Sequence, residues 1–157
     1  MRAKKTEILL ENRRAYYDYD ILEVKKAGIE LKGSEVKSLR KKMGSLKGSY
    51  GIIRNNEMFL INFDIPPYQV NNVSPSYDSH RPKKLLLKKQ EILRWNTMRQ
   101  QRLLTIIPLK VYNDTTGLIK VDIALAKRKK KYDKRLKIKE RESKRNLERI
   151  KKEQSWG

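Results

Sequence analysis

The chain has 157 residues, of which 38% are hydrophobic, and its 39 Lys and Arg against 18 Asp and Glu give a formal net charge of +21. This length and hydrophobic content allow one domain with a modest core and exclude two such domains. The excess of positive charge favours a polyanionic partner, with nucleic acid preferred over an anionic membrane surface.

Residue types that several kinds of chemistry require are missing. The sequence has no cysteine and a single histidine, His80, so it offers no disulfide, no thiolate metal site and no histidine-based catalytic centre. We therefore expect no catalytic residue, no metal and no cofactor. No apolar run approaches the ~18 residues of a membrane span, and the first twelve residues lack a signal-peptide pattern. The resulting expectation is a cytoplasmic protein without membrane association.

The N-terminal region predicts an arm followed by two short strands. Residues 1–14 are basic and show no hydrophobic period, which predicts a mobile arm that closes onto the body near Asn12. Alternating residues predict a strand at 17–21 and a second at 29–31, separated by a break at residues 27–28.

A helix is predicted to follow the second strand. Ser34 is a favourable N-cap residue, and Gly44 suits the position just after a helix end. The apolar face of this helix holds Val36, Leu39 and Met43. Its outer face carries Lys37 and Arg40.

The middle of the chain predicts a hairpin and a loop. Residues 50–54 and 57–63 flank Asn55 and Asn56, which accept the positive φ angles of a two-residue turn. The second strand is apolar on both faces, so we expect a helix to cover it. Residues 69–82 are polar and bear Pro and Asn, which predicts a mobile loop.

Residues 83–99 have the length and spacing of a second helix. Three consecutive leucines, Leu85 to Leu87, cannot all face one core from a helix, so at least one is a candidate for an exposed contact. We assign this role to Leu86; ordinary core packing is the alternative.

The remaining pattern completes a β-rich body. Residues 103–111 alternate as a strand, in which Pro108 requires an edge or a bulge. Residues 114–117 predict a turn, and a strand at 118–125 pairs back across it. Six strands and two helices at short spacings indicate a mainly β fold with helices, α+β in class: a small six-stranded β-barrel with two helices covering its openings.

Composition changes sharply at Ala126, which predicts a folded domain at 1–126 and a basic C-terminal tail at 127–157. The tail holds fifteen Lys and Arg and five Asp and Glu, a net charge of +10. Its Glu and Lys residues at i, i+4 spacing favour helix by ~0.3 kcal/mol per pair, but its apolar stripe is thin. We expect a tail that is disordered when free and helical when bound. A solvated charge run without a specific role is the alternative.

Long motifs follow one another in a fixed order along nearly the whole chain. They are NRRA at 12–15 before Tyr19, AGIELKGSEVKSLR at 27–40, RPKKLLLKK at 81–89, Pro108-Leu109 before Tyr112, KVDIALAK at 120–127, YDKR at 132–135 and IKERESKR at 138–145. With these motifs the chain resembles the small protein B family, the partner of transfer-messenger RNA (tmRNA, or SsrA RNA) in rescuing stalled bacterial ribosomes.

The resemblance implies a fold, a function and partners. The fold would be a β-barrel of the oligonucleotide-binding type, whose surface holds the transfer-RNA-like end of tmRNA. The tail would enter the empty messenger channel of the ribosome near the decoding centre of its 16S rRNA and become helical there. Alanyl-tRNA synthetase and elongation factor Tu would be reached through the tmRNA, and the protein would act as a monomer.

The resemblance also assigns residues to these contacts. In the body, Asn12 and Leu86 retain the family's RNA-facing residues, and Lys26 stands at another such position. Beside them we expect phosphate contacts from Lys37, Arg40, Lys84 and Lys89. In the tail, the positions near the decoding centre are Lys129, Lys130, Tyr132, Asp133, Lys134 and Arg135. From the residues alone, two alternatives stay open. Asn12 could brace a turn, and Lys37 and Arg40 could belong to a solvated helix face without a partner.

Three residues depart from the family pattern. Lys26 stands where the family usually has Glu, which exchanges a hydrogen-bond acceptor for a charge at an RNA-facing position. Leu103 and Arg128 stand where it usually has Gly. Because Arg disfavours positive φ, the tail is expected to leave the body of this protein in a different direction.

Three classes of function compete. The first is a non-enzymatic adaptor that binds tmRNA for ribosome rescue, and the second is a structural ribosomal or transfer-RNA-binding protein with a basic tail. The third, a nuclease or RNA-modifying enzyme, lacks clustered carboxylates, a usable histidine, a Gly-rich phosphate loop and any cofactor motif. The tail motif behind this body favours the adaptor.

Overall fold

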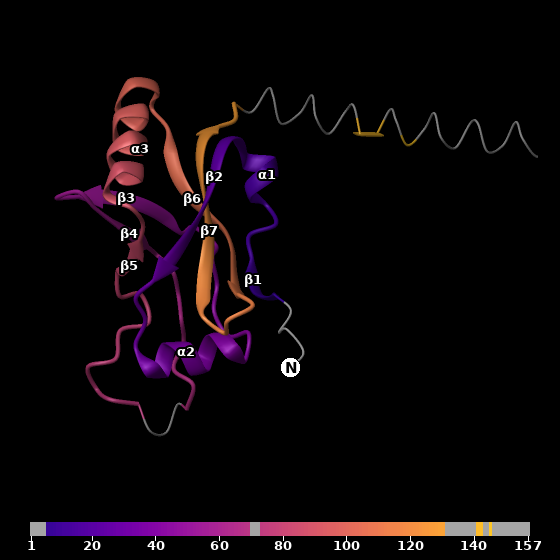
Figure 1. The fold of residues 1–157 in the computed structure, drawn as a ribbon. Coiled ribbons are helices and arrows are strands. Elements are labelled where there is room, and N and C mark those ends of the chain that lie inside the picture. The colour runs from indigo at the N-terminus through magenta and orange to yellow at the C-terminus, as the bar shows by residue number, and fades with distance from the viewer. Residues whose placement is uncertain (1–5, 70–72, 131–140, 143–144, 146–157) are drawn as a thin grey trace, which may run out of the picture.

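The computed structural model describes residues 6–69, 73–130, 141–142 and 145 (Figure 1). Within these residues, seven strands form one antiparallel sheet in the order β1-β6-β3-β4-β5-β2-β7, and a further pairing of β6 with β7 closes six of them into a ring. The strands are β1 (Glu7–Glu11), β2 (Tyr19–Ile29), β3 (Tyr50–Arg54), β4 (Glu57–Ile61), β5 (Lys83–Leu86), β6 (Thr105–Asn113) and β7 (Ile119–Arg128). The mainly β fold with covering helices is confirmed.

Three helices accompany the ring. They are α1 (Ala15–Asp18), α2 (Gly33–Arg40) and α3 (Lys89–Arg102). Figure 1 shows α2 and α3 at opposite ends of the ring of strands, as expected for two covering helices, whereas the single turn α1 lies at its side. None of the helices in the described parts of the chain is long and apolar enough to cross a membrane.

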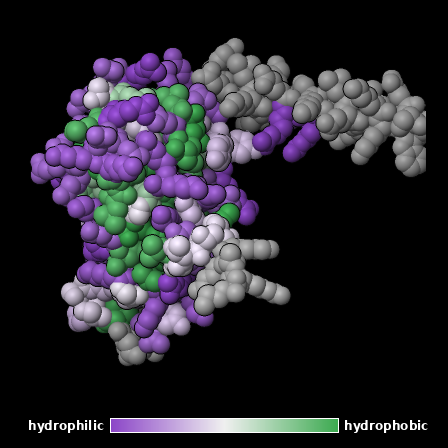
Figure 2. All heavy atoms as spheres, viewed as in Figure 1, coloured by the Kyte–Doolittle hydropathy of each residue, from purple (hydrophilic) through white to green (hydrophobic). Residues whose placement is uncertain are grey.

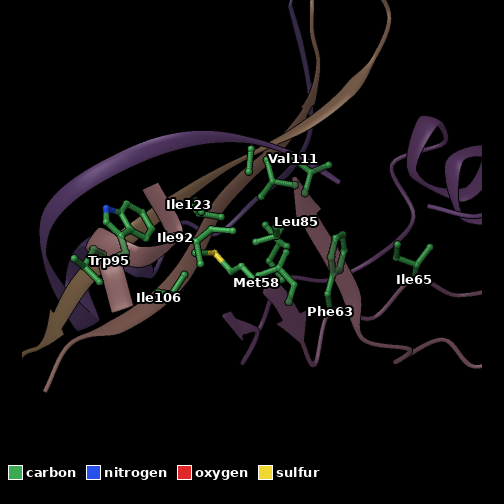
Figure 3. Packing of buried hydrophobic residues seen from close by; sticks show 14 of the residues in the cluster. Met58, Phe63, Ile65, Leu85, Ile92, Trp95, Ile106, Val111 and Ile123 are labelled. Atoms are coloured by element: carbon green, nitrogen blue, oxygen red, sulfur yellow. The ribbon is translucent and has the colours of Figure 1, made fainter. Parts of the chain in front are cut away.

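The hydrophobic core fills the inside of the ring (Figure 3). Strand residues meet there with two residues of α3, Ile92 and Trp95, and Trp95 is fully buried. The strand residues labelled in the figure are Met58, Leu85, Ile106, Val111 and Ile123. Each large apolar side chain buried in this way contributes about 1.5 to 3 kcal/mol, so the core holds α3 firmly against the sheet.

The N-terminal arm is in part a strand, which corrects the sequence-based expectation. Glu7–Glu11 pairs antiparallel with β6 outside the ring, and Leu9 is buried in the core. The strand is stabilised by a partner about one hundred residues away, and its own sequence carries no period because a register shift interrupts it between Ile8 and Leu10.

The two predicted strands at 17–21 and 29–31 are one strand, β2, which runs unbroken through Ala27 and Gly28. Pairing with β7 along most of its length and with β5 at its end holds it extended. The break predicted at residues 27–28 was therefore wrong. Gly28 is the point of close approach to β5 rather than a turn.

Helix α2 differs from the prediction at both ends. Lys32 is the N-cap residue in place of Ser34, and its backbone N–H donates to the Glu35 carboxylate at 2.7 Å. The helix ends at Arg40, and Lys42 takes the left-handed conformation with φ of 59° before Gly44 is reached. Of the predicted apolar face, only Leu39 is buried, and Val36 and Met43 are half-buried. The other buried residues of α2 are Glu35 and Ser38.

The hairpin prediction is confirmed. Asn55 and Asn56 have φ angles of 51° and 61°, and β3 pairs with β4 directly across this turn. On β4, Met58 and Leu60 face the core, whereas Phe59 and Ile61 face outward and are half-buried. The expected cover of this outward face by a helix is wrong for the described residues, since α3 packs at the end of the ring.

The predicted helix at 83–99 is two elements. Lys83–Leu86 is strand β5, paired with β4 and with the end of β2, and the helix begins only at Lys89. Within β5, Lys83 and Leu85 are buried while Leu86 is exposed, which is the alternation of a strand. A lysine with a fully buried side chain hides this alternation in the sequence.

The last two strands carry the predicted irregularity and one unexpected extension. Pro108 in β6 lies at a register shift opposite β7, as a proline within a strand requires. Strand β6 starts at Thr105, because Leu103 forms the left-handed end of α3 with φ of 53°. Strand β7 continues to Arg128, three residues beyond the predicted end, and pairs there with Tyr19.

Candidate nucleic-acid interface

One group of candidate residues lies on the outer face of β5 and β2. Leu86 has 47% of its surface exposed and lies across Gly28, where a Cβ would come 3.1 Å from the Leu86 Cβ. Lys26 is exposed two residues before Gly28 on β2, and Lys84 is half-buried two residues before Leu86. Figure 2 shows apolar atoms exposed in a band over the region of β4, β5 and the end of β2, bordered by polar surface. We call Lys26, Lys84 and Leu86 the Leu86 strip.

Two lysines at the Leu86 strip, Lys84 and Lys89, differ in their surroundings. Lys84 lies 3.5 Å from the Glu57 carboxylate and beside Phe59 on β4. Lys89 is exposed at the start of α3, three residues after Leu86. An exposed ion pair such as Lys84 with Glu57 contributes little, about 0 to 1 kcal/mol, so a phosphate can replace the carboxylate readily.

Lys26, the departure from the family pattern, lies opposite Asp122 of β7 in the β2–β7 register. Asp122 is in turn 3.6 Å from Lys110 of β6. Burial next to this carboxylate raises the pKa of Tyr112 to about 12, so its hydroxyl stays protonated throughout the physiological range. A glutamate at position 26 would supply a hydrogen-bond acceptor opposite Asp122. Lys26 places a positive charge there instead.

Asn12 lies in a second place, at the junction of β1 and α1. Its backbone N–H donates to Leu109 O at 2.8 Å, and its side-chain amide donates to Pro108 O at 3.0 Å. These bonds satisfy backbone carbonyls at the irregularity of β6. Asn12 therefore acts as a brace, which is one of the two roles that its sequence left open.

The same junction borders a hollow of about 790 Å³, which we call the Asn12 pocket. Its walls include four basic residues that the sequence analysis did not assign to RNA contacts: Arg13, Arg14, Lys47 and Arg128. Arg13 and Arg14 belong to the NRRA motif, so that motif was the available signal. The other two come from distant segments, and only the fold brings them to Asn12.

The structure does not gather all the candidate residues at one point. Asn12 binds β6 and Leu86 belongs to β5, and these strands are separated by β3 and β4 on one side of the ring and by β7 and β2 on the other. Lys37 and Arg40 are exposed on α2, at the other end of the ring from α3 (Figure 1). Arg40 donates to Gly117 O at 3.4 Å in the turn between β6 and β7.

A buried charge cluster positions β5. The Lys83 ammonium donates to Phe63 O at 2.7 Å, to Arg81 O at 2.9 Å and to Ser79 O at 3.3 Å. Glu35 of α2 accepts from Arg81 at 2.6 Å and lies 3.9 Å from Lys83. Burial lowers the pKa of Lys83, but three carbonyls and a carboxylate around the ammonium support its charged form. The cluster joins α2, the loop after β4 and β5 into one unit.

The first residues of the predicted tail belong to the body. Lys129 is only 6% exposed: its backbone N–H donates to Asp18 O at 2.9 Å, and its ammonium donates to Tyr16 O at 2.7 Å. Arg128, the other departure in this region, is extended within β7 and pairs with Tyr19. These contacts fix residues 128 and 129 against α1 and the start of β2. Among the remaining candidates, Lys130 is exposed, and Tyr132, Asp133, Lys134 and Arg135 lie outside the described residues.

A metal centre has no counterpart in the part of the chain that the structure describes. These residues contain no group of three or more His, Cys, Asp or Glu side chains arranged to hold an ion. The chemistry of the surface is that of cations beside exposed apolar and aromatic side chains, which suits phosphates and bases.

A closed ring of antiparallel strands with two basic surfaces, in a chain of net charge +21, defines a small nucleic-acid-binding protein. The family model described as "SmpB protein" matches residues 9–153. The chain belongs to this family, and the resemblance found in the motifs is confirmed.

Relatives match over nearly their whole length. The SsrA-binding protein of Thermosipho africanus is 48% identical over 141 residues, covering 90% of this chain and 94% of the relative. That of Clostridium tetani is 43% identical over 155 residues, covering 99% and 98%. A solved structure described as "tmRNA-SmpB: a journey to the center of the bacterial ribosome" contains a chain that is 44% identical, with a TM-score of 0.64, covering 78% of this chain and 85% of that one.

Proposed function

We propose that the protein is a tmRNA-binding adaptor in trans-translation that binds the transfer-RNA-like part of tmRNA and carries it to stalled ribosomes in the cytoplasm. Membership of the SmpB family supports this function. The observation that carries it in the structure is Leu86, exposed over Gly28 between lysines of the Leu86 strip. An exposed leucine held in place by a glycine is suited to contact a ligand rather than to fill a core.

The protein acts by binding and not by catalysis. Phosphate contacts from exposed lysines supply most of the affinity, and the apolar contact at Leu86 fixes the position of the RNA on the body. Alanyl-tRNA synthetase and elongation factor Tu are reached through the tmRNA that the protein binds.

The tail reports to the ribosome that its messenger channel is empty. It carries a net charge of +10, which suits a channel walled by 16S rRNA phosphates. About twenty residues in helical form would span ~30 Å of that channel. Tyr132 stacks on a base near the decoding centre, while Asp133, Lys134 and Arg135 hold the start of the bound helix.

The RNA-binding part of the proposal is tested by the salt dependence of tmRNA affinity. With four or more phosphate contacts, the log–log slope is expected to be about −3 or steeper, because each contact contributes about 0.7 to 0.9. Lys89→Gln should reduce the magnitude of the slope by about one such increment. A slope near zero would remove the electrostatic basis of binding, and equal affinity for tmRNA and for an elongator transfer RNA would favour a general transfer-RNA-binding protein.

The tail is tested by peptide tagging on stalled ribosomes. Replacing Asp133, Lys134 and Arg135 together by alanine should leave tmRNA affinity nearly unchanged and abolish tagging. A matched variant replaces Arg149, Lys151 and Lys152, which removes more positive charge further along the tail, and should retain more activity. Full tagging by the first variant would refute the role given to these residues.

A further inference from the structure

The outer face of the β3–β4 hairpin is an apolar surface without a covering layer in the described residues. Cross-strand pairing sets Tyr50 beside Ile61 and Ile52 beside Phe59. These four side chains, with Pro82 at one edge and Arg54 at one end, line a hollow of about 540 Å³. We call it the β3–β4 groove. The core face of the same strands is filled by residues such as Met58 and Leu60, so the groove is a second apolar face of one hairpin.

The groove is continuous with both parts of the candidate interface. Tyr50 lines the β3–β4 groove and the Asn12 pocket alike. At the other side, Phe59 is the register partner of Lys84 in the Leu86 strip. The strands between Asn12 and Leu86 on this side of the ring are β3 and β4 themselves. A polyanion that contacts both basic surfaces along this route must cross the groove.

The polar groups at the end of the groove suit a nucleotide. Arg54 is exposed and makes no ion pair among the described residues, whereas Glu57 opposite it is turned to Lys84. The groove thus has a free guanidinium at its end, with its one lining carboxylate already paired. Asn55 beside it offers an amide that can both donate and accept a hydrogen bond.

We propose that the β3–β4 groove binds an unpaired RNA base, which stacks on Tyr50 and Phe59 while Arg54 contacts the adjoining phosphate. Aromatic side chains on the outer face of a sheet are a common platform for unstacked bases, and their contact tolerates any base because every base has a π-face. The free arginine and the charge of the chain favour RNA over an apolar protein partner. The site lies beyond the contacts of the proposed function and does not depend on tmRNA being the ligand.

The test uses the full chain and a single-stranded probe, a hexamer of adenosine with 2-aminopurine at one inner position. Tyr50→Leu and Phe59→Leu keep an apolar side chain but remove the ring. Each is expected to raise the dissociation constant of the probe by about 5-fold or more and to reduce the fluorescence change of 2-aminopurine on binding. Tyr68→Leu is the matched control, since Tyr68 is 38% exposed and Tyr50 39%, and it should bind as the wild type does.

Charge and stacking are separated by salt titration. Arg54→Gln should reduce the magnitude of the log–log slope by about 0.7, the value for one phosphate contact on a single strand, whereas Tyr50→Leu should leave the slope unchanged. Arg102→Gln removes an exposed arginine at the end of α3 and is the control for net charge. Equal slopes for the two arginine variants and equal affinities for the two tyrosine variants would overturn the proposal.

A measurement on the wild type covers the case in which a groove variant fails to fold. A hexamer carrying 4-thiouridine should cross-link to peptides containing residues 50–54 or 57–61, and cross-links confined to other segments would overturn the assignment. Sedimentation tests whether a second copy of the chain occupies the groove instead of RNA. If the wild type is a dimer that Tyr50→Leu dissociates, the groove binds a second copy and not RNA. Affinity for tmRNA is measured in parallel, so a failure of the groove with intact tmRNA binding leaves the proposed function standing.

Discussion

Leu85 and Leu86 are neighbours in β5 that point to opposite sides of the sheet: Leu85 is 1% exposed inside the ring, and Leu86 is 47% exposed outside it. The two form a matched pair for testing contact against core. Leu85→Ala should lower the free energy of unfolding by about 2 to 5 kcal/mol, the range for emptying a packed core site. Leu86→Ala should change it by less than about 1 kcal/mol and weaken tmRNA binding by about 1 to 2 kcal/mol. Urea unfolding and filter binding measure the two effects, and a large loss of stability in Leu86→Ala would contradict its role as a contact.

Lys83 should be more important for stability than any exposed lysine. Lys83→Met leaves Phe63 O and Arg81 O without their donor and removes a positive charge near buried Glu35. Breaking a buried charged cluster in this way costs about 3 to 5 kcal/mol. Lys84→Met, one residue along the same strand, is the control and should cost about 1 kcal/mol or less because its ion pair is exposed. Equal unfolding midpoints for the two variants would contradict a structural role for the cluster.

Leu103 is held in a backbone conformation that favours glycine. Its φ is 53°, and 90% of its surface is exposed, so its side chain contributes no packing to offset the strain. The left-handed conformation costs an L-residue about 1 to 2 kcal/mol, which glycine avoids. Glycine in turn loses more conformational entropy on folding, which costs about 0.5 to 1 kcal/mol. Leu103→Gly should therefore raise the free energy of unfolding by about 0.5 to 1 kcal/mol. Leu118→Gly, at an exposed position without positive φ, should not stabilise the protein.

Acid should weaken the contact between α3 and β2. The carboxylate of Glu91 accepts a hydrogen bond from Lys25 at 3.0 Å, and this bond lowers the pKa of Glu91 from its ordinary 4.5. Because the folded state holds the proton less tightly than the unfolded state, the contribution is complete above pH 4.5 and is lost as the pH falls through the lower folded pKa. Between about pH 6 and pH 3, the wild type should lose more unfolding free energy than Glu91→Gln. Glu30→Gln, at an exposed position without an ion pair in the described residues, should follow the wild type.

The position at which the tail is removed should matter. A chain ended after Ala126 lacks Lys129 and the last pairs of β7 with β2, although it keeps the apolar core. A chain ended after Lys130 keeps them. The shorter chain should be less stable by about 1.5 to 3 kcal/mol, the range for a hydrogen bond of a charged group. Both should bind tmRNA and neither should support tagging. Equal stability of the two chains would show that the contacts of Lys129 are not needed by the fold.

Local signals predicted the parts of the fold that local chemistry decides. The Asn55-Asn56 turn and the irregularity at Pro108 were found because turn geometry and the missing N–H of proline act within a few residues. Strand β1 was missed because its partner is β6, and β2 was divided because the reason for Gly28 lies on β5. The sequence of one strand does not specify the distant strand with which it pairs.

The candidate site shows the same division. The exposure of Leu86 was predicted, but on the assumption of a helix, whereas the alternation of β5 is the actual cause. Lys83 and Lys129 appear in the sequence as two more lysines of basic runs, and only the fold shows that both are buried. Exposed and buried lysines look alike in a sequence because the carbonyls that receive a buried ammonium come from distant residues.

Strand β7, from which the tail departs, is bonded to β2 on one side and to β6 on the other along nearly its whole length. A pull on the tail directed along this strand would load both ladders at once in shear, with the Lys129 contacts to α1 taking the first strain. Such a geometry resists traction far better than a strand peeled from an edge, where bonds break one at a time. The body should therefore stay folded when its C-terminal end is pulled along β7.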